Sequence, residues 1–150
     1  MKPLVNSVVI RRSVEDVFDY CSDLANERAW NPDLVSLEEL GPRPIAVGTR
    51  FRTRWKGGPS TECAYTLVDK PGRWEIHASA KGMDIDFRGE VESTDGGARL
   101  TITMTLLPRG LLRLVGPLIR RGFQNKEEKN LERIRVALEG SAGASAVDGG

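Results

Sequence analysis

One stretch near the C-terminus constrains the fold more than any other part of the sequence. Residues 110–139 place apolar side chains three and four positions apart, first over 111–123 and again over 131–138. This spacing predicts one long amphipathic helix. At ~1.5 Å per residue the helix would run roughly 43 Å, the width of a small domain. A helix of this length needs an extended apolar surface to pack against.

The predicted helix has a polar gap in its middle. Residues 124–130 include no apolar side chain. At ~100° per residue, Glu127 and Asn130 lie close to the line that joins the apolar residues of the two halves. Two interpretations stay open. Either Gly116-Pro117 kinks the helix and its middle is solvated, or these polar residues form part of a cavity wall.

The sequence period changes from 3.6 to 2 between residues 34 and 108. Apolar and polar side chains alternate there in six segments separated by turns, most of them rich in Gly and Pro. This pattern is typical of antiparallel strands with one buried and one solvated face. The six predicted strands are 34–40, 48–56, 60–69, 73–81, 83–93 and 99–107.

The residues before these strands predict three further elements. Residues 3–11 are rich in Val and Ile and predict a first strand. Ser13 and Asp23 are suitable N-caps for two short helices, 13–22 and 23–27. A sheet of seven strands with one apolar face needs a cover, and only the helices can supply it. We therefore predict an α+β fold: a seven-stranded curved antiparallel sheet around one long C-terminal helix, with two short helices between strands 1 and 2.

Length and composition limit the number of domains and the class of partner. The chain has 150 residues and a formal net charge of +1, so we expect one domain at residues 1–139. Residues 140–150 are small and glycine-rich and predict a disordered tail. The balanced charge gives no long-range attraction for nucleic acid, so we expect no nucleic-acid partner. No apolar run approaches the ~20 residues of a membrane span, and we expect no stable membrane insertion.

The remaining composition argues against metal chemistry. The sequence has one histidine, His77, predicted on a solvated strand face, and two separated cysteines, Cys21 and Cys63. A transition-metal site needs several converging ligands, so we expect no metal and no cofactor. The N-terminus lacks the pattern of a signal peptide. We expect a cytoplasmic protein with reduced cysteines, as a monomer or homodimer.

The apolar face of the predicted sheet is rich in aromatic residues. Tyr and Trp side chains need hydrogen-bond partners when buried, so they can orient a polar group on an apolar ligand. Each residue is also consistent with ordinary core. In this hypothesis Trp30 closes the mouth of a cavity, or instead caps the helix pair. The candidate ligand-binding residues are Trp30, Phe51, Trp55, Tyr65, Trp74, Phe87, Met104, Leu118, Phe123 and Glu127.

Three segments carry a resemblance to a known family. They are Ser13–Tyr20 (SVEDVFDY), Asp23–Pro32, which ends in WNP, and Asn130–Glu139. Over residues 5–139 the sequence resembles the SRPBCC superfamily, which includes START-like, birch-pollen-allergen-like and polyketide cyclase/dehydrase proteins. The resemblance implies a helix-grip fold that holds a hydrophobic ligand between the sheet and the C-terminal helix. It implies catalysis only in some branches.

Three functions are compatible with these observations. The first is binding of a hydrophobic small molecule of lipid, polyketide or isoprenoid type. The second is a polyketide cyclase or dehydratase acting in the same cavity, for which Tyr65 and Glu127 are the inward acid–base candidates. The third is an interaction module whose partner surface is residues 111–123.

Overall fold

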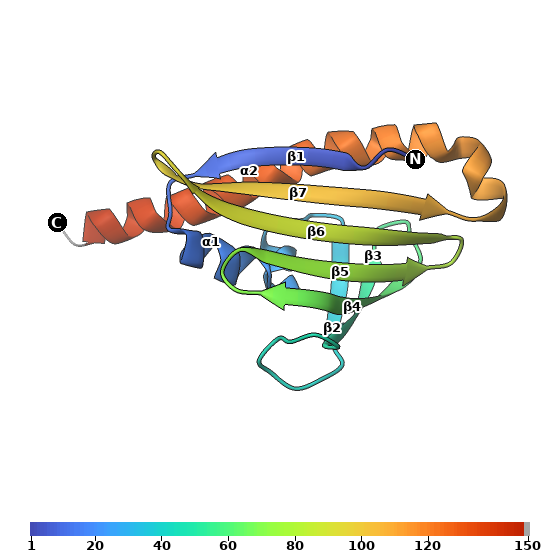
Figure 1. Cartoon of the computed structure of the whole chain (residues 1–150), viewed down its shortest axis with the longest axis horizontal. Coiled ribbons are helices and arrows are strands. Elements are labelled where there is room, and N and C mark those ends of the chain that lie inside the picture. The colour runs from blue at the N-terminus through green and yellow to red at the C-terminus, as the bar shows by residue number, and fades with distance from the viewer. Residues whose placement is uncertain (149–150) are drawn as a thin grey trace.

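A curved antiparallel sheet of seven strands packs against one long helix and two short ones (Figure 1). The computed structural model describes residues 1–148, with side chains described through residue 140. The elements are β1 (Leu4–Ile10), α1 (Val14–Cys21), η1 (Leu24–Ala29), β2 (Leu34–Glu39), β3 (Arg50–Trp55), β4 (Ser60–Asp69), β5 (Arg73–Ala80), β6 (Met83–Thr94), β7 (Gly97–Pro108), η2 (Gly110–Val115) and α2 (Gly116–Asp148). The predicted fold class is confirmed.

The sheet is a meander of β2 to β7, and β1 is added at the edge beside β7. Its strand order is β1-β7-β6-β5-β4-β3-β2. Strands β2 to β7 pair in sequence order, and β1 returns to pair with β7 from Leu4↔Met104 to Ile10↔Ala98. The first and last strands are therefore neighbours, and α2 follows directly along β1 (Figure 1).

Two hydrophobic clusters fill the space under the helices. The larger one joins α1, the inner face of β3 to β7 and the second half of α2 through Leu131, Ile134 and Leu138. The smaller one contains Leu4, Met104 and Leu106, with Ile119 and Phe123 of α2 packed against it. The polar gap of α2 lies between these two sets of apolar contacts.

The predicted single helix over 110–139 is divided into two elements. Residues 110–115 form the 3-10 helix η2, and α2 begins at Gly116. Pro117 therefore lies in the first turn of α2, where its missing N–H costs nothing and its fixed φ suits a helix start. The change of direction at Gly116-Pro117 is a helix start rather than a kink.

The C-terminal end of the helix lies beyond its predicted position. The sequence predicted its end at Glu139, but α2 continues to Asp148. Three alanines lie at positions 142, 144 and 146, and alanine has the highest helix propensity. The predicted disordered tail at 140–150 overlaps this last stretch of α2 and stays a prediction. Residues 149–150 lie outside the described residues.

Contacts from the segment between β1 and α1 hold the second half of α2 in place. Arg12 Nη1 donates to the carbonyl of Leu138 at 2.9 Å, and the Arg12 guanidinium also pairs with Asp16 at 3.0 Å. The backbone N–H of Arg11 donates to Glu139 Oε1 at 3.1 Å. These contacts fix the helix over the sheet, so the position of its polar gap is also fixed.

Candidate functional site

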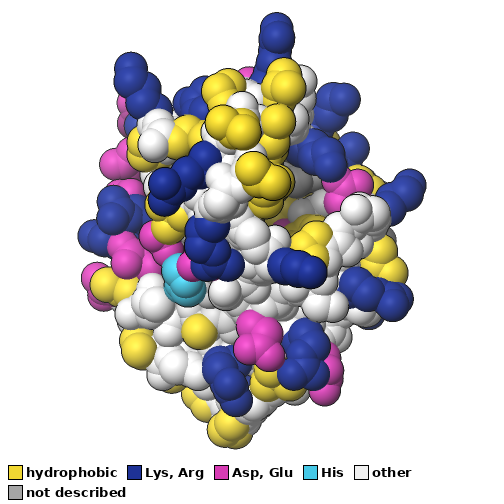
Figure 2. Space-filling view, turned by 90° about the vertical axis from the view of Figure 1, so that its right-hand side faces the viewer, with side chains coloured by type: hydrophobic (Ala, Val, Ile, Leu, Met, Phe, Trp, Pro, Cys, Tyr) yellow, Lys and Arg dark blue, Asp and Glu magenta, His cyan; other side chains and the backbone are white. Residues whose placement is uncertain are grey.

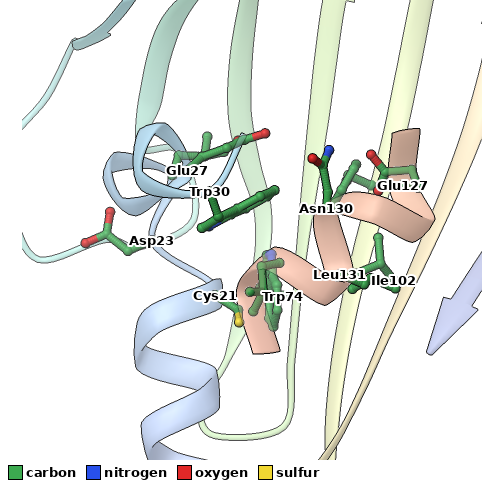
Figure 3. Close-up of a pocket in the computed structure, with 12 residues that line it drawn as sticks. Cys21, Asp23, Glu27, Trp30, Trp74, Ile102, Glu127, Asn130 and Leu131 are labelled. Atoms are coloured by element: carbon green, nitrogen blue, oxygen red, sulfur yellow. The ribbon is translucent and has the colours of Figure 1, made fainter. Parts of the chain in front are cut away.

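A small pocket lies where η1 faces the polar gap of α2, above the inner face of the sheet (Figure 3). Its volume is about 30 Å³, close to the space that one water molecule occupies. The lining residues are Cys21, Asp23, Leu24, Glu27, Trp30, Trp74, Phe87, Ile102, Glu127, Asn130, Leu131 and Ile134. The polar gap of α2 therefore faces a cavity, as one of the two interpretations of the sequence proposed.

Local hydrogen bonds position η1 over the sheet. Asp23 caps η1, and its Oδ1 accepts from the N–H of Ala25 at 3.0 Å. The Tyr65 hydroxyl on β4 donates to the carbonyl of Ser22 at 2.5 Å and accepts from the N–H of Leu24 at 3.1 Å. The corner between α1 and η1 is thus attached to the sheet by a buried side chain.

Glu27 enters the pocket from η1. In a 3-10 helix residues i and i+3 share a face, and Glu27 lines the pocket together with Trp30. Asn31 Nδ2 donates to Glu27 Oε1 at 2.9 Å. Burial raises the pKa of Glu27 to about 7, the hydrogen bond from Asn31 opposes this rise, and the charge of Glu127 adds to it.

Glu127 enters the pocket from α2 (Figure 3). Burial raises the pKa of Glu127 to about 7, against the opposing effect of the Asn130 side chain. Within residues 1–140 neither Glu27 nor Glu127 has a salt-bridge partner, and the nearby Lys126 pairs with Asp33 at 3.0 Å. Both carboxyl groups can therefore exchange protons near neutral pH.

The floor and one wall of the pocket are apolar. Trp74, Phe87 and Ile102 come from the sheet, and Leu131 and Ile134 come from α2. Phe18 packs edge-on against Trp74, with ring centroids 5.5 Å apart. This combination of apolar walls and a few convergent polar groups is typical of small-molecule sites.

Trp30 brings to the pocket an apolar ring and an indole N–H without a hydrogen-bond partner among the described side chains. Its indole Nε1 is buried and has no hydrogen-bond partner within the described side chains. A buried, unpaired N–H is destabilising by roughly 1–3 kcal/mol. The pocket thus contains one hydrogen-bond donor that the described chain does not satisfy.

Four of the ten predicted site residues meet at this pocket: Trp30, Trp74, Phe87 and Glu127. Phe51 and Tyr65 are instead fully packed in the larger core cluster. Met104 and Phe123 belong to the smaller cluster. Trp55 is half-buried at the end of β3, outside both clusters.

The predicted place of Leu118 in the cavity wall is wrong. Its side chain is 70% exposed. Ile119 and Phe123 contact the sheet, and at ~100° per residue Leu118 is rotated away from the line they define. Leu118, in the first turn of α2, therefore points toward solvent and does not line the cavity.

The end of α1 and η1 supply four of the pocket residues that were not among the candidates. Cys21, Asp23, Leu24 and Glu27 were not among the candidates, yet all line the pocket. Glu27 precedes Trp30 by three positions, the spacing that aligns side chains on a 3-10 helix. This spacing was the available signal for Glu27.

One family model matches most of the chain. The sequence profile described as "Polyketide cyclase / dehydrase and lipid transport" matches residues 1–139. The chain belongs to this family. The match is consistent with the SRPBCC resemblance of the sequence. A comparison with the curated proteins found no match.

Several solved structures share the fold. The Zhui aromatase/cyclase from Streptomyces sp. R1128 aligns with a TM-score of 0.77 at 10% identity, over 92% of this chain and 93% of that one. The di-domain aromatase/cyclase StfQ from the steffimycin biosynthetic pathway aligns with a TM-score of 0.76 at 13% identity, over 94% of this chain and 52% of that one. The TTHA0849 protein from Thermus thermophilus aligns with a TM-score of 0.73 at 16% identity, over 93% of this chain and 98% of that one.

The described residues contain neither a membrane-spanning helix nor a cluster of metal ligands. No helix among them is long and apolar enough to cross a membrane. No group of three or more His, Cys, Asp or Glu side chains within the described part of the chain is arranged to hold a metal ion. The family membership and the pocket together support a hydrophobic ligand-binding or cyclase role.

Proposed function

We propose that this protein binds a hydrophobic small molecule in the pocket between the sheet and α2. The observation that carries this proposal is the composition of the pocket. Apolar walls from Trp74, Phe87 and Ile102 lie beside two carboxyl groups, Glu27 and Glu127. Such a site holds the apolar body of a ligand and orients one polar end.

The size of the pocket implies that a ligand must widen it. A cavity of about 30 Å³ is much smaller than the roughly 300–1,000 Å³ of typical ligand sites. We propose that η1 moves away from α2 and that Trp30, just after η1, is displaced with it. The Lys126–Asp33 salt bridge between α2 and the residues after η1 is largely exposed at its lysine, so breaking it costs little.

The polar groups define what the ligand should carry. A carbonyl or ether oxygen would accept a hydrogen bond from the unpaired Trp30 Nε1. A hydroxyl group would bond to Glu27 or Glu127. Lipids, polyketides and isoprenoid alcohols all combine such groups with a large apolar body. The proposed ligand therefore belongs to one of these three classes.

Native mass spectrometry of the purified protein tests the proposal first, because a tightly held ligand would remain bound. Titration with a fatty acid, an anthraquinone and farnesol, followed by tryptophan fluorescence, then compares the three classes. We expect saturable binding of at least one class at one site per chain. No retained molecule and no saturable binding would overturn the proposal.

Two variants locate the binding site. Ile102→Trp fills the pocket from the floor and should abolish binding, and Leu131→Phe should weaken it from the α2 side. A matched control is Val136→Trp, since Val136 is 56% exposed on the same helix. Thermal melting of each variant separates loss of binding from loss of folding.

A polyketide cyclase or dehydratase is the second candidate function. The specific observation in its favour is that Glu27 and Glu127 both face the pocket with pKa values of about 7. In a dehydration, the ionised carboxylate would remove the proton next to a carbonyl. The protonated carboxyl would give its proton to the departing hydroxyl, which leaves as water while the C=C bond forms.

Turnover separates the two functions. An aryl β-hydroxyketone, assayed by the absorbance of its enone product, provides a simple substrate for the dehydration. If the protein is an enzyme, Glu127→Gln and Glu27→Gln should each lower the rate by about 10²-fold or more while binding is kept. If the protein only binds, wild type gives no rate above that of the buffer.

A further inference from the structure

An exposed apolar surface covers η2 and the first turn of α2, before the polar gap. The side chains of Leu111, Leu114 and Leu118 are 84%, 79% and 70% exposed. We call this surface the apolar patch; its members are Met1, Leu107, Leu111, Leu114, Val115 and Leu118. Figure 2 shows hydrophobic side chains gathered in the upper part of this face of the molecule, with Lys and Arg side chains around them. A contiguous exposed apolar patch of this kind marks an interaction site.

The patch is held in place by ordered contacts. The N–H of Arg109 donates to the carbonyl of Gly82 at 2.8 Å. Leu112 packs onto the same glycine, where an added Cβ would lie 2.8 Å from Leu112 Cδ1. These contacts use the inward side of η2, so Leu111 and Leu114 are presented outward by a fixed segment.

The N-terminus fixes the other side of the patch. Arg120 Nε donates to the carbonyl of Lys2 at 3.1 Å, which attaches the N-terminus to α2. Met1 packs against Gly116, where an added Cβ would lie 2.5 Å from Met1 Cε. The patch is thus assembled from segments that lie far apart in the sequence.

Basic side chains predominate in the part of the chain that forms the patch. Residues 96–126 include no Asp or Glu. The basic side chains on η2, at the start of α2 and just before η2 are Arg109, Arg113, Arg120 and Arg121. Arg99 lies at the opposite end of β7 and pairs with Glu92, and Lys126 pairs with Asp33. One acidic residue, Asp84, approaches the patch, and Arg109 already pairs with it at 2.9 Å. Arg113 and Arg121 have no salt-bridge partner within residues 1–140.

A surface hollow adjoins the patch. It has a volume of about 430 Å³ and is lined by Met1, Asp84, Leu106, Leu107, Pro108, Arg109 and Arg113. Apolar side chains and two arginines therefore border the same hollow. This arrangement suits a group with both an apolar chain and an anionic head.

We propose that the apolar patch docks this protein on an anionic lipid surface. Outward leucines on a short helix enter the boundary between head groups and acyl chains, and surrounding arginines bind the anionic head groups. A second copy of this chain fits the surface less well, because two-fold association would bring the arginines of both copies together. The proposal concerns a different surface from the pocket and does not depend on ligand binding there.

Vesicle sedimentation tests this docking. The full chain is mixed with vesicles of phosphatidylcholine alone, or of phosphatidylcholine and phosphatidylserine in equal amounts. We expect binding to the anionic vesicles, much weaker binding to the neutral ones, and a loss of binding at high salt because salt screens exposed charges. No sedimentation with anionic vesicles overturns the proposal.

Variants identify the residues involved. Leu114→Glu/Leu118→Glu should weaken vesicle binding by about tenfold or more, and Arg113→Gln/Arg121→Gln by about tenfold. The matched control is Val5→Glu/Val136→Glu, since both valines are more than half exposed and lie outside the patch. This control should weaken binding much less than the leucine variant, and melting temperatures verify that each variant folds.

Two other results would count against the proposal. Vesicle binding that survives Leu114→Glu/Leu118→Glu would assign it to another surface. Sedimentation equilibrium that shows a dimer in wild type and a monomer in the leucine variant would assign the patch to a second copy of the chain.

Discussion

The hydroxyl group of Tyr65 and the carbonyl group of Ser22 form a buried hydrogen bond of 2.5 Å that joins β4 to the end of α1. The same hydroxyl accepts from the N–H of Leu24, so its donor and one acceptor position are used within the chain. Burial raises the pKa of Tyr65, and the phenol stays protonated at neutral pH. Tyr65 therefore positions η1 and has no proton free for the acid–base role that its sequence position first suggested.

Tyr65→Phe should destabilise the fold. The carbonyl of Ser22 and the N–H of Leu24 lose their partner, and leaving buried polar groups unpaired costs about 1–3 kcal/mol. Urea unfolding measures this difference. Tyr20→Phe is the matched control, because the Tyr20 hydroxyl makes no hydrogen bond within the described residues, and we expect it to change the unfolding free energy by less than about 0.5 kcal/mol. Equal effects of the two variants would contradict the role of Tyr65.

The carboxyl pair of the pocket should make stability depend on pH. In the folded chain the pKa values of Glu27 and Glu127 rise from 4.5 to about 7. Between these values the folded state binds more protons than the unfolded state, so stability falls as pH rises from about 4.5 to about 7. The limiting slope is about 1.4 kcal/mol per pH unit for each group. Above pH 7 the loss is complete.

The comparison of wild type with Glu27→Gln/Glu127→Gln isolates this effect. Other carboxylates make stability rise with pH, because nearby arginines lower the pKa of Glu75 and Glu132 in the folded chain. Glutamine resembles the neutral acid, so the double variant should gain stability relative to wild type from pH 5 to pH 8, by up to about 5 kcal/mol. Glu128→Gln on the exposed face of α2 is the control. A constant difference across this range would argue against the raised pKa values.

Gly89 should tolerate no side chain. A Cβ at Gly89 would lie 2.1 Å from Trp74 Cζ2, so alanine must displace the indole that forms the floor of the pocket. Overpacking of this kind costs roughly 1–3 kcal/mol. Gly41→Ala is the control, since an added Cβ there meets no atom within 4 Å. Thermal and urea unfolding of the two variants give the comparison, and an unchanged Gly89→Ala protein would refute the close contact.

The elements of this fold were predictable because their patterns are local. Alternation marks a strand wherever it occurs, and Ser13 and Asp23 cap α1 and η1 as expected. The division between η2 and α2 was harder to predict, because residues 111–123 keep helical spacing across it. The exposure of Leu118 was difficult to predict for the same reason. Helical spacing identifies an apolar stripe, but the extent of the sheet determines which residues of the stripe are buried.

The pocket could be predicted only in part, because it depends on how distant elements meet. Glu127 was identified from its place in an otherwise apolar helix face. Glu27 belongs to a six-residue 3-10 helix with no apolar stripe against which an inward carboxylate would stand out. Tyr65 was expected to face a ligand, but its hydroxyl group donates a hydrogen bond to the carbonyl of Ser22 at the end of α1. No pattern within a single strand contains that information.

Truncation should locate the end of the domain. The family profile stops at residue 139, and Leu138 is the last buried residue among those described. A chain that stops after Gly140 should therefore unfold within about 1 kcal/mol of the full chain in urea. A chain that stops after Arg133 loses Ile134 and Leu138, which are 3% and 5% exposed. Each such loss costs about 2–5 kcal/mol, so this chain should be strongly destabilised or unfolded. A large loss of stability on removing only residues 141–150 would instead make the end of α2 part of the domain.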